Sequence, residues 1–413
     1  VRQLRDIVTL EKGKPPVQQP YLGQDAELYL TPEYLRGKAA AEPVKPGANA
    51  VRVLDGDIIV LWDGSNAGEF FRARKGILAS TMSRIGYNDA FDKGYFFYAV
   101  KNWEAFLKGQ TSGSGIPHVD KEVLGRIAIL QFARPEQTKI ADILSTVDLA
   151  IEQTEALIAK QQRIKTGSMQ DLLTRGIDEH GNLRSEPTHQ FKDSPVGRIP
   201  VEWEVVALGS VSEISSGITL GKSYSGPNTV ELPYLRVANV QDGYLDLTDV
   251  KLIRIPKCNV ERYELRVGDV LMNEGGDFDK LGRGCVWNGE IEHCLHQNHV
   301  FKVRPKQGLL ASDYLAAVSS SPYGKSFFVL ASKQSTNLAS INSTQLKSFP
   351  IPLPEYCEQL RIEKLAKQYT SVYNEAMRRL SKLRSLKTAL MQDLLTGKVR
   401  VTPLLDKMEV TDG

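Results

Sequence analysis

A chain of 413 residues is too long for one ordinary hydrophobic core, so we expect two to four domains. An apolar content of 41% with 24% charged residues excludes a disordered chain, and a net charge of +3 excludes a polybasic one. The four cysteines predict no disulfide framework, and the sequence has neither a signal peptide nor an apolar run long enough to span a bilayer, which fits a reducing, cytoplasmic compartment.

The first segment, residues 1–134, is predicted to be a strand-rich domain of mixed α/β type. The stretch "VLDGDIIVLWDG", from Val53, places Gly-Asp before a β-branched run, which indicates a turn followed by a buried strand. The stretch "GQTSGSGIPHVDKEVLGRIAIL", from Gly109, predicts a polar loop, a short helix and a strand. The chain begins at Val1 without a Met, so we expect a missing or trimmed N-terminus.

Residues 135–175 are predicted to form one long helix. Pro135 stands at its start and Gly176 just after its end, as helix punctuation requires. Residues 176–203 are rich in Gly, Pro and polar side chains, and we expect them to be a linker between two halves of the chain.

The second half has the same skeleton as the first. Residues 204–353 contain "LRVGDVLMNEGG", which again places Gly-Asp before a buried run, and "KQSTNLASINSTQLKSFPIPLP", which again ends in a strand. A second long helix is predicted over residues 354–397, followed by a tail at 398–413. The order is therefore globule, helix, globule, helix.

The two long helices share a register offset by 222 positions. "MQDLLT" occurs at residues 169–174 and again at 391–396, and the same offset places Gln137 on Gln359. Apolar residues recur at steps of three and four in both copies, which predicts a heptad-like stripe. We expect the stripes to pack against each other as a coiled coil; packing inside a larger helical bundle is the alternative. The stripe residues are Ile140, Ile143, Val147, Ala150, Leu157, Ile164 and Leu172 in the first copy, and Ile362, Leu365, Tyr369, Val372, Ala376, Leu383, Leu386, Leu390 and Leu394 in the second.

The repeated hexapeptide predicts a surface that meets a partner, because a stripe requires apolar residues but does not require repeated Gln and Asp. Two equivalent copies predict two copies of that partner. The docking residues are Gln170, Asp171, Leu172, Leu173, Gln392, Asp393, Leu394 and Leu395.

No catalytic residues and no metal ligands are predicted. The stretch "GITLGKS" has one residue too few between its glycines for a phosphate loop, and the Asn-Pro-Pro-Tyr signature of adenine methylation is missing. The spacing of a Cys and His cluster fits no common zinc site, so we interpret it as structural, with Cys294 and Val300 in a core. The cluster comprises Cys285, His293, Cys294, His296 and His299.

The chain resembles the specificity subunit of type I restriction–modification systems. The resemblance rests on the globule–helix duplication, on "RIPVEWEVVALGSVSEISSGIT", "LPYLRVANVQDGYLDL", "HCLHQNHVFKV" and "SFPIPLPEYCEQLRI", and on the ending "LMQDLLTGKVRV". It covers nearly the whole chain, more closely in the second half than in the first.

The resemblance implies an α+β fold in which two pseudo-repeated target-recognition domains are separated by two long antiparallel helices that form a coiled coil. Each domain would read one half of a bipartite site in double-stranded DNA. The helices would fix the spacer and dock two methyltransferase subunits, joined by motor-nuclease subunits. S-adenosylmethionine, ATP and Mg would bind the partners, and this chain would have no cofactor and no catalysis of its own.

DNA contacts are expected from polar and basic side chains on loops, because these reach base edges and phosphates. The alternatives to DNA recognition are a coiled-coil protein adaptor and a self-contained DNA-modifying enzyme. The candidate contacts are Lys12, Lys14, Ser65, Asn66, Arg72, Arg74, Lys75, Gln110, Thr111 and Ser112 in the first domain, and Lys222, Tyr224, Arg236, Asn239, Lys280, Arg283, Lys333, Gln334, Ser335 and Asn337 in the second.

Overall fold

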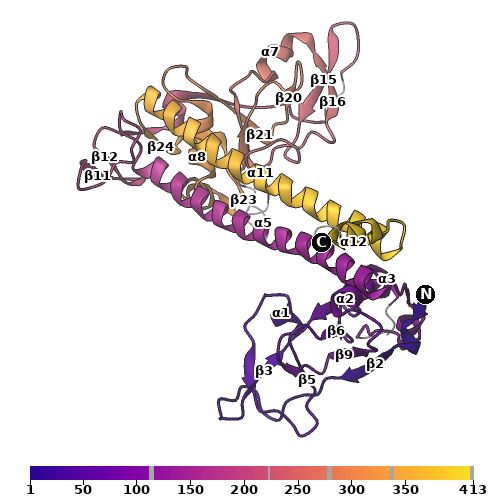
Figure 1. The fold of residues 1–413 in the computed structure, drawn as a ribbon. Coiled ribbons are helices and arrows are strands. Elements are labelled where there is room, and N and C mark those ends of the chain that lie inside the picture. The colour runs from indigo at the N-terminus through magenta and orange to yellow at the C-terminus, as the bar shows by residue number, and fades with distance from the viewer. Residues whose placement is uncertain (111–115, 222–223, 277–280, 335–338, 410–413) are drawn as a thin grey trace. The chain divides into compact units, whose positions relative to one another are not determined.

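The structure is a computed structural model that describes residues 1–110, 116–221, 224–276, 281–334 and 339–409. The chain divides into two compact units. Unit 1 comprises Val1–Ala156 and Met377–Gly413, and unit 2 comprises Leu157–Ala376. The two long helices predicted from the sequence are present as α5 (Arg134–Thr174) and α11 (Tyr356–Leu395), and each contributes one part to each unit (Figure 1).

Unit 1 begins with a strand-rich stretch that leads into α5. Its strands are β1 (Arg2–Gln3), β2 (Val8–Lys12), β3 (Glu27–Leu30), β4 (Glu42–Val44), β5 (Arg52–Val53), β6 (Ile58–Leu61), β7 (Phe70–Arg72), β8 (Gly76–Leu78), β9 (Met82–Tyr87) and β10 (Ala128–Ile129). Its helices besides the long pair are η1 (Leu4–Asp6), α1 (Pro32–Leu35), α2 (Lys93–Lys101), α3 (Glu104–Gly109), α4 (Lys121–Arg126) and α12 (Thr402–Glu409).

The strands of unit 1 form two four-stranded sheets and a short pair. The first sheet has the order β2-β9-β6-β7, and all its neighbours are antiparallel. The second has the order β4-β3-β8-β5, in which β3 and β8 are parallel. Strand β1 pairs antiparallel with β10, so the start of the unit is tied to the strand that precedes α5.

Unit 2 also places a strand-rich stretch before its long helix. Its strands are β11 (Phe191–Ser194), β12 (Gly197–Pro200), β13 (Glu204–Ala207), β14 (Ser212–Ser216), β15 (Thr229–Leu235), β16 (Lys251–Pro256), β17 (Val270–Asn273), β18 (Gly275–Gly276), β19 (Gly284–Val286), β20 (Leu295–His296), β21 (Val300–Pro305), β22 (Lys333–Gln334), β23 (Ala339–Ser340) and β24 (Pro350–Leu353). Its shorter helices are α6 (Leu208–Val211), η2 (Lys257–Asn259), α7 (Val260–Tyr263), α8 (Ser312–Ser320), α9 (Pro322–Ala331) and α10 (Ser343–Lys347).

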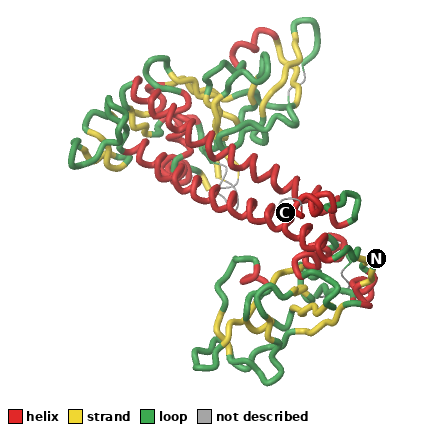
Figure 2. Tube along the Cα trace, in the orientation of Figure 1, coloured by secondary structure: helices red, strands yellow, loops and turns green. Residues whose placement is uncertain are grey.

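The sheets of unit 2 follow the same plan as those of unit 1. A four-stranded sheet has the order β14-β21-β17-β19, with antiparallel neighbours throughout. A second sheet, β16-β15-β20, contains one parallel pair, and β13 pairs antiparallel with β24 just before α11. In both units the strands are short and are connected by long loops (Figure 2).

The Gly-Asp turns predicted before a buried strand are present in both units. Gly56 and Gly268 have φ angles of +77° and +91°, a left-handed conformation that favours glycine. The following Asp57 and Asp269 accept hydrogen bonds from the backbone N–H groups of Leu54 (3.0 Å) and Arg266 (2.8 Å). Every residue of β6 and of β17, the strands that follow, is buried.

Two segments are more structured than the sequence indicated. Residues 176–203, predicted as a linker, contain the β11–β12 hairpin and the buried residues Arg184 and Trp203. Residues 398–413, predicted as a tail, contribute Val401 to the core of unit 1. None of the described helices is both long enough and apolar enough to cross a lipid bilayer.

Candidate DNA-recognition loops and helix ends

Most DNA-contact candidates of unit 1 are exposed and lie on loops or at strand ends. Thr111 and Ser112 lie outside the described residues. The exposed candidates are Lys12, Lys14, Ser65, Asn66, Arg72, Arg74, Lys75 and Gln110. Whether any of them contacts DNA stays a prediction.

The loop that carries Lys12 and Lys14 is fixed at Gly13. A Cβ atom on Gly13 would lie 2.2 Å from the carbonyl oxygen of Ala79, so only glycine permits this backbone approach. Gly217, the counterpart in unit 2, is equally close to a backbone carbonyl, because its Cβ would lie 1.9 Å from the oxygen of His296. Both glycines therefore anchor the loop that follows the first strand of the four-stranded sheet.

Arg72 is exposed but is held by two aromatic rings of its own unit. Its guanidinium carbon lies 4.3 Å from the ring centroid of Phe97 and 4.9 Å from that of Tyr98. Such cation–π contacts orient an exposed arginine, and the guanidinium also hydrogen-bonds the side chain of Tyr98. Arg72 is therefore positioned by contacts within its own unit.

Asn239 of unit 2 does not fit the prediction of a direct DNA contact. Its side chain is 3% exposed, and its amide nitrogen donates to the carbonyl oxygens of Asp246 (2.9 Å) and Asp249 (3.1 Å). Arg236 donates to the side chain of Asp249 at 2.9 Å, and its backbone N–H donates to Asn239. These two residues shape the loop from 236 to 249. Asn239 is buried because its side-chain amide donates to backbone carbonyl oxygens inside that loop.

The other candidates of unit 2 are less fully described. Lys333 is exposed, while Tyr224 and Arg283 are half-buried, with the Nη1 atom of Arg283 3.5 Å from the Gln241 side-chain oxygen. The remaining candidates, Lys222, Lys280, Ser335, Asn337 and the side chain of Gln334, lie outside the described residues.

The Cys and His cluster has structural roles. Cys294 and Val300 lie in one hydrophobic core cluster, as predicted, together with Cys285. Burial raises the pKa of both cysteine thiols to about 12 and lowers the pKa of His296 to about 4. His293 and His299 instead pair with Glu264 and Glu274. Among the described residues, no group of three or more His, Cys, Asp or Glu side chains could hold a metal ion.

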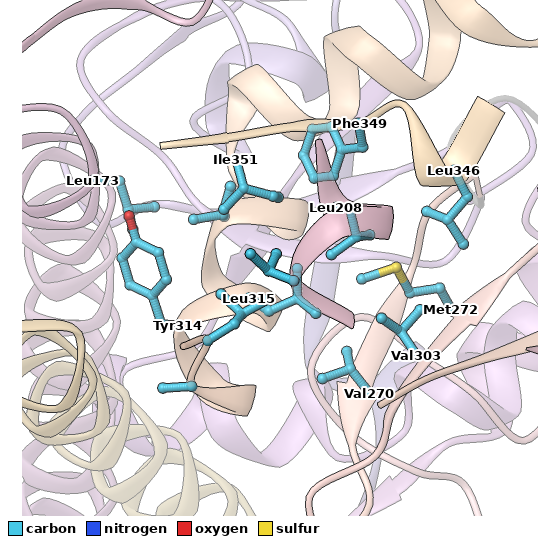
Figure 3. Packing of buried hydrophobic residues seen from close by; sticks show 14 of the residues in the cluster. Leu173, Leu208, Val270, Met272, Val303, Tyr314, Leu315, Leu346, Phe349 and Ile351 are labelled. Carbon is cyan, nitrogen blue, oxygen red and sulfur yellow. The ribbon is translucent and has the colours of Figure 1, made fainter. Parts of the chain in front are cut away.

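The leucines of the repeated hexapeptide are buried, so the prediction that they form an exposed docking surface is wrong. Leu172 and Leu173 are 2% and 6% exposed in the core of unit 2, and Leu394 and Leu395 are 3% and 7% exposed in the core of unit 1. In unit 2, Leu173 lies beside the ring of Tyr314 (Figure 3). The end of each long helix therefore fills the core of one unit.

Other positions of the hexapeptide also have intramolecular contacts. The hydroxyls of Thr174 and Thr396 donate to the carbonyl oxygens of Gln170 and Gln392 one turn earlier. Asp171 pairs with Arg175 (3.6 Å), and Asp393 pairs with Lys398 (3.2 Å). The side chains of Gln170 and Gln392 are exposed, and they are the part of the hexapeptide that still fits an external partner.

The starts of the two long helices carry the same glutamine with the same three hydrogen bonds. In unit 1, the side chain of Gln137 donates to the carbonyl oxygens of Phe132 (2.8 Å) and Ala90 (2.9 Å) and accepts from the N–H of Asp92 (2.7 Å). In unit 2, Gln359 does the same. It donates to Pro354 and Leu309, both at 2.9 Å, and accepts from Ala311 at 2.8 Å. Both side chains are buried and bind the residue that precedes α2 or α8.

A buried tyrosine adds a further equivalent contact in each unit. The hydroxyl of Tyr95 donates to the carbonyl oxygen of Leu130 at 2.9 Å, and that of Tyr314 donates to Pro352 at 2.7 Å. Each acceptor stands seven residues before the glutamine of its unit. Burial raises the pKa of both phenols, which keeps them protonated as donors.

A carboxylate directly before each glutamine binds an arginine, and the sequence reasoning did not identify either pair. Glu136, 1% exposed, accepts two hydrogen bonds from Arg400, at 2.7 and 2.6 Å. Glu358, 4% exposed, accepts from both terminal nitrogens of Arg184. The signal was present, because Glu-Gln recurs at the 222-residue offset.

The apolar stripes are only partly buried. Leu157 and Ile164 of α5 are 41% and 38% exposed, and Val372 and Leu386 of α11 are 50% and 48% exposed, so the prediction is wrong at these four positions. The predicted stripe residue Ala376 is buried, and so is Thr154, which shares the 222-residue offset with it but was not predicted. An α-helix of 3.6 residues per turn drifts away from a strict seven-residue repeat, which rotates the predicted stripe out of the contact.

The comparisons identify the family. A family model described as "Type I restriction modification DNA specificity domain" matches residues 1–161 and 200–383. The MjaVIII type I restriction enzyme specificity subunit of Methanocaldococcus jannaschii is 33% identical over 98% of this chain and 93% of its own length.

The chain belongs to the type I restriction–modification specificity family.

Solved structures agree in fold with this assignment. The type I S subunit from M. genitalium matches with a TM-score of 0.60 and 15% identity over 95% of both chains. A chain from a structural study of the assembly and conformational transition of the type I system matches with a TM-score of 0.50 and 16% identity, over 95% of this chain and 96% of its own. In sequence, the specificity subunit of the Escherichia coli K12 EcoKI enzyme is a more distant relative, 22% identical over 64% of this chain and 56% of its own length.

Within this specificity family, the matched segments leave the helix ends out. Both copies of the hexapeptide, at 169–174 and 391–396, fall outside residues 1–161 and 200–383. The match to the family model therefore does not describe the helix ends, and their role is inferred from the contacts that they make in this structure.

Proposed function

We propose that the two units of this type I specificity subunit are pseudo-repeated recognition domains, each of which reads one half of a bipartite site in double-stranded DNA. The observation that carries the proposal is the pair of four-stranded sheets, β2-β9-β6-β7 and β14-β21-β17-β19, with one strand order. The identical hydrogen bonds of Gln137 and Gln359 support it. The loops differ between the units, as they must if the two half-sites differ.

The helices α5 and α11 form the spacer in this proposal, as an antiparallel coiled coil. Within unit 1, Asp148 pairs with Lys387 (2.6 Å) and Glu155 with Arg384 (2.7 Å), so a higher number in α5 meets a lower number in α11. Helices of this length extend about 60 Å. Half-sites on one face of DNA recur every 34 Å or so, which is within the reach of such a rod.

Two methyltransferase subunits dock on equivalent surfaces of the helices. Ile164 and Leu386 share the 222-residue offset and are exposed apolar side chains, so both helices present an apolar contact at the equivalent position. The exposed Gln170 and Gln392, with Asp171 and Asp393, lie less than two turns further along the same helices. They provide polar contacts at the rim of each surface.

The chain itself is not an enzyme in this proposal. Its partners hold S-adenosylmethionine for adenine methylation, and motor-nuclease subunits hold ATP and Mg. This division predicts that the purified chain alone, supplied with S-adenosylmethionine and DNA, transfers no methyl groups. Methylation by the chain alone would refute the division.

The decisive experiment is a genome-wide map of methylated adenines in cells with and without this gene. We expect one bipartite motif, two short specific halves with a fixed gap, to lose methylation when the gene is deleted. A motif that persists after deletion would show that another chain determines it. Purified complex should then methylate duplexes carrying that motif and ignore duplexes with either half scrambled.

A further inference from the structure

Each unit contains an ion pair that joins the start of one long helix to the segment that follows the other. In unit 1 the pair is Glu136–Arg400, and its residues stand 264 positions apart in sequence. In unit 2 the pair is Glu358–Arg184, 174 positions apart. Arg400 follows the end of α11, and Arg184 follows the end of α5.

In both ion pairs the arginine and the carboxylate are joined by two hydrogen bonds, which fix their relative orientation. Arg400 donates from Nε and Nη2 to the two oxygens of Glu136, and Arg184 donates from Nη1 and Nη2 to the two oxygens of Glu358. Two parallel N–H···O bonds fix the plane of the guanidinium as well as its distance. The pairs therefore constrain angle, which a single surface ion pair does not.

Glycines with left-handed backbone lead each arginine to its carboxylate. Gly176 and Gly397, each two residues after the end of its helix, have φ angles of +63° and +72°. Gly176 is packed so closely that a Cβ would lie 2.2 Å from Glu358 Oε1. In unit 2 the carboxylate also accepts from the N–H of Ile177 (2.9 Å) and from Trp203 Nε1 (3.3 Å).

The helix-start glutamine connects this ion pair to the recognition unit. Gln137 follows Glu136 and binds the residue before α2, and Gln359 follows Glu358 and binds the residue before α8. Three segments of each unit thus meet at one Glu-Gln dipeptide. They are the body of the unit, the start of one long helix and the chain that leaves the other.

We propose that Glu136–Arg400 and Glu358–Arg184 are positioning ion pairs, which fix the attachment of each recognition unit to the helix pair and so contribute to the strict spacing between the two half-sites. This inference rests on the proposed function. In this inference, neither ion pair contacts DNA. One base pair changes the distance between half-sites by about 3.4 Å, so an attachment that tolerates a shift of that size loses the ability to reject a wrong spacer.

The test measures spacer discrimination by the complete complex with its partner subunits. The substrates are duplexes that carry both half-sites from the methylation map, with the natural gap or with one base pair added or removed. The expected result for Arg400→Ala is a fall of about threefold or more in the ratio of methylation rates on natural and altered gaps, because loosened positioning lowers the advantage of the correct geometry. The preferred bases within each half should not change.

The conservative variant Arg400→Lys keeps the charge and loses the two-bond geometry. We expect it to lose spacer discrimination while unfolding at the denaturant concentration of the wild type. It therefore decides the question if Arg400→Ala does not assemble. The matched control is Arg52→Ala, since Arg52 makes a similar two-bond pair with Glu27 in unit 1 and is 56% exposed, against 54% for Arg400.

Three outcomes are separable. Altered spacer discrimination in the Arg400 variants, with Arg52→Ala unchanged, supports the inference. Unchanged discrimination in assembled Arg400→Lys, or an equal loss of rate on all gaps, overturns it. If the wild-type complex methylates no bipartite site, the proposed function itself fails.

Discussion

Unit 2 is built from one continuous stretch of chain, whereas unit 1 is completed by a segment from the other end of the sequence. The difference extends to their ion pairs. In Glu358–Arg184 the two side chains are 5% and 10% exposed, whereas in Glu136–Arg400 the carboxylate is 1% exposed and the arginine 54% exposed. The same residue types at the same place thus form part of a core in one unit and a solvent-facing attachment in the other.

The largest expected effect is the removal of the helix-end leucines. Leu172→Ala with Leu173→Ala should destabilise unit 2, and Leu394→Ala with Leu395→Ala should destabilise unit 1, because each buried leucine costs about 2–5 kcal/mol when it is truncated. Pulse proteolysis at graded urea, with fragments assigned to each unit, measures both. Leu149→Ala, at a position that is 53% exposed, is the control. Wild-type stability with a lost partner subunit would restore the docking role of these leucines.

Removing the carboxylate of each ion pair should destabilise the two units by different amounts. Glu358→Ala leaves Arg184 buried without its partner, a change that costs about 3–5 kcal/mol. Glu136→Ala should cost less, because the exposed side of Arg400 can turn into water. The same proteolysis experiment compares them, with Glu27→Ala as the matched surface control. Equal losses in the two units would show that exposure of the arginine does not matter.

Charging the exposed apolar positions should weaken docking without unfolding either unit. Ile164→Lys and Leu386→Lys should each lower the affinity for one methyltransferase copy by about tenfold, the cost of losing one interface anchor. Native mass spectrometry of the assembled complex counts the copies. Leu149→Lys is the control, since its counterpart at the 222-residue offset is the polar Ser371. Two full copies in both variants would place the docking surface elsewhere.

The two units should also differ in acid sensitivity. Burial lowers the pKa of His296 from 6.5 to about 4, so the unfolded chain binds a proton at higher pH than the folded chain. Unit 2 should therefore lose stability as pH falls from about 6.5 to about 4. Hydrogen bonds from Arg400 lower the pKa of Glu136, so its contribution to unit 1 is present above the ordinary glutamate value and is lost only as pH falls below it.

Urea midpoints of the two units at several pH values check this order. His296→Gln should flatten the slope of unit 2 above pH 4 and leave the slope of unit 1 unchanged. A slope in unit 2 that survives this substitution would assign the sensitivity to other groups.

The sequence predicted the long helices, the Gly-Asp turns and the core positions of Cys294 and Val300, because these depend on local pattern. It did not predict the burial of Leu173 in a core that includes distant residues such as Tyr314, nor the partner of Glu136, which stands 264 positions away. Nor did it predict that Asn239 turns inward, because an asparagine in a polar loop serves DNA or its own backbone equally well. The two copies of "MQDLLT" lie at the ends of the two long helices, where each contributes leucines to the core of one unit, so most of their contacts are internal.

The discontinuity of unit 1 also has a consequence for synthesis. On the ribosome, all of unit 2 is synthesised before Met377, whereas Leu394 and Leu395, which belong to the core of unit 1, are synthesised after it. At 5–20 residues per second, the first-made domain waits roughly 12–50 s for the segment that completes it. The half of the protein that is translated first is thus the last to finish folding, and during that interval its apolar gap is exposed to chaperones.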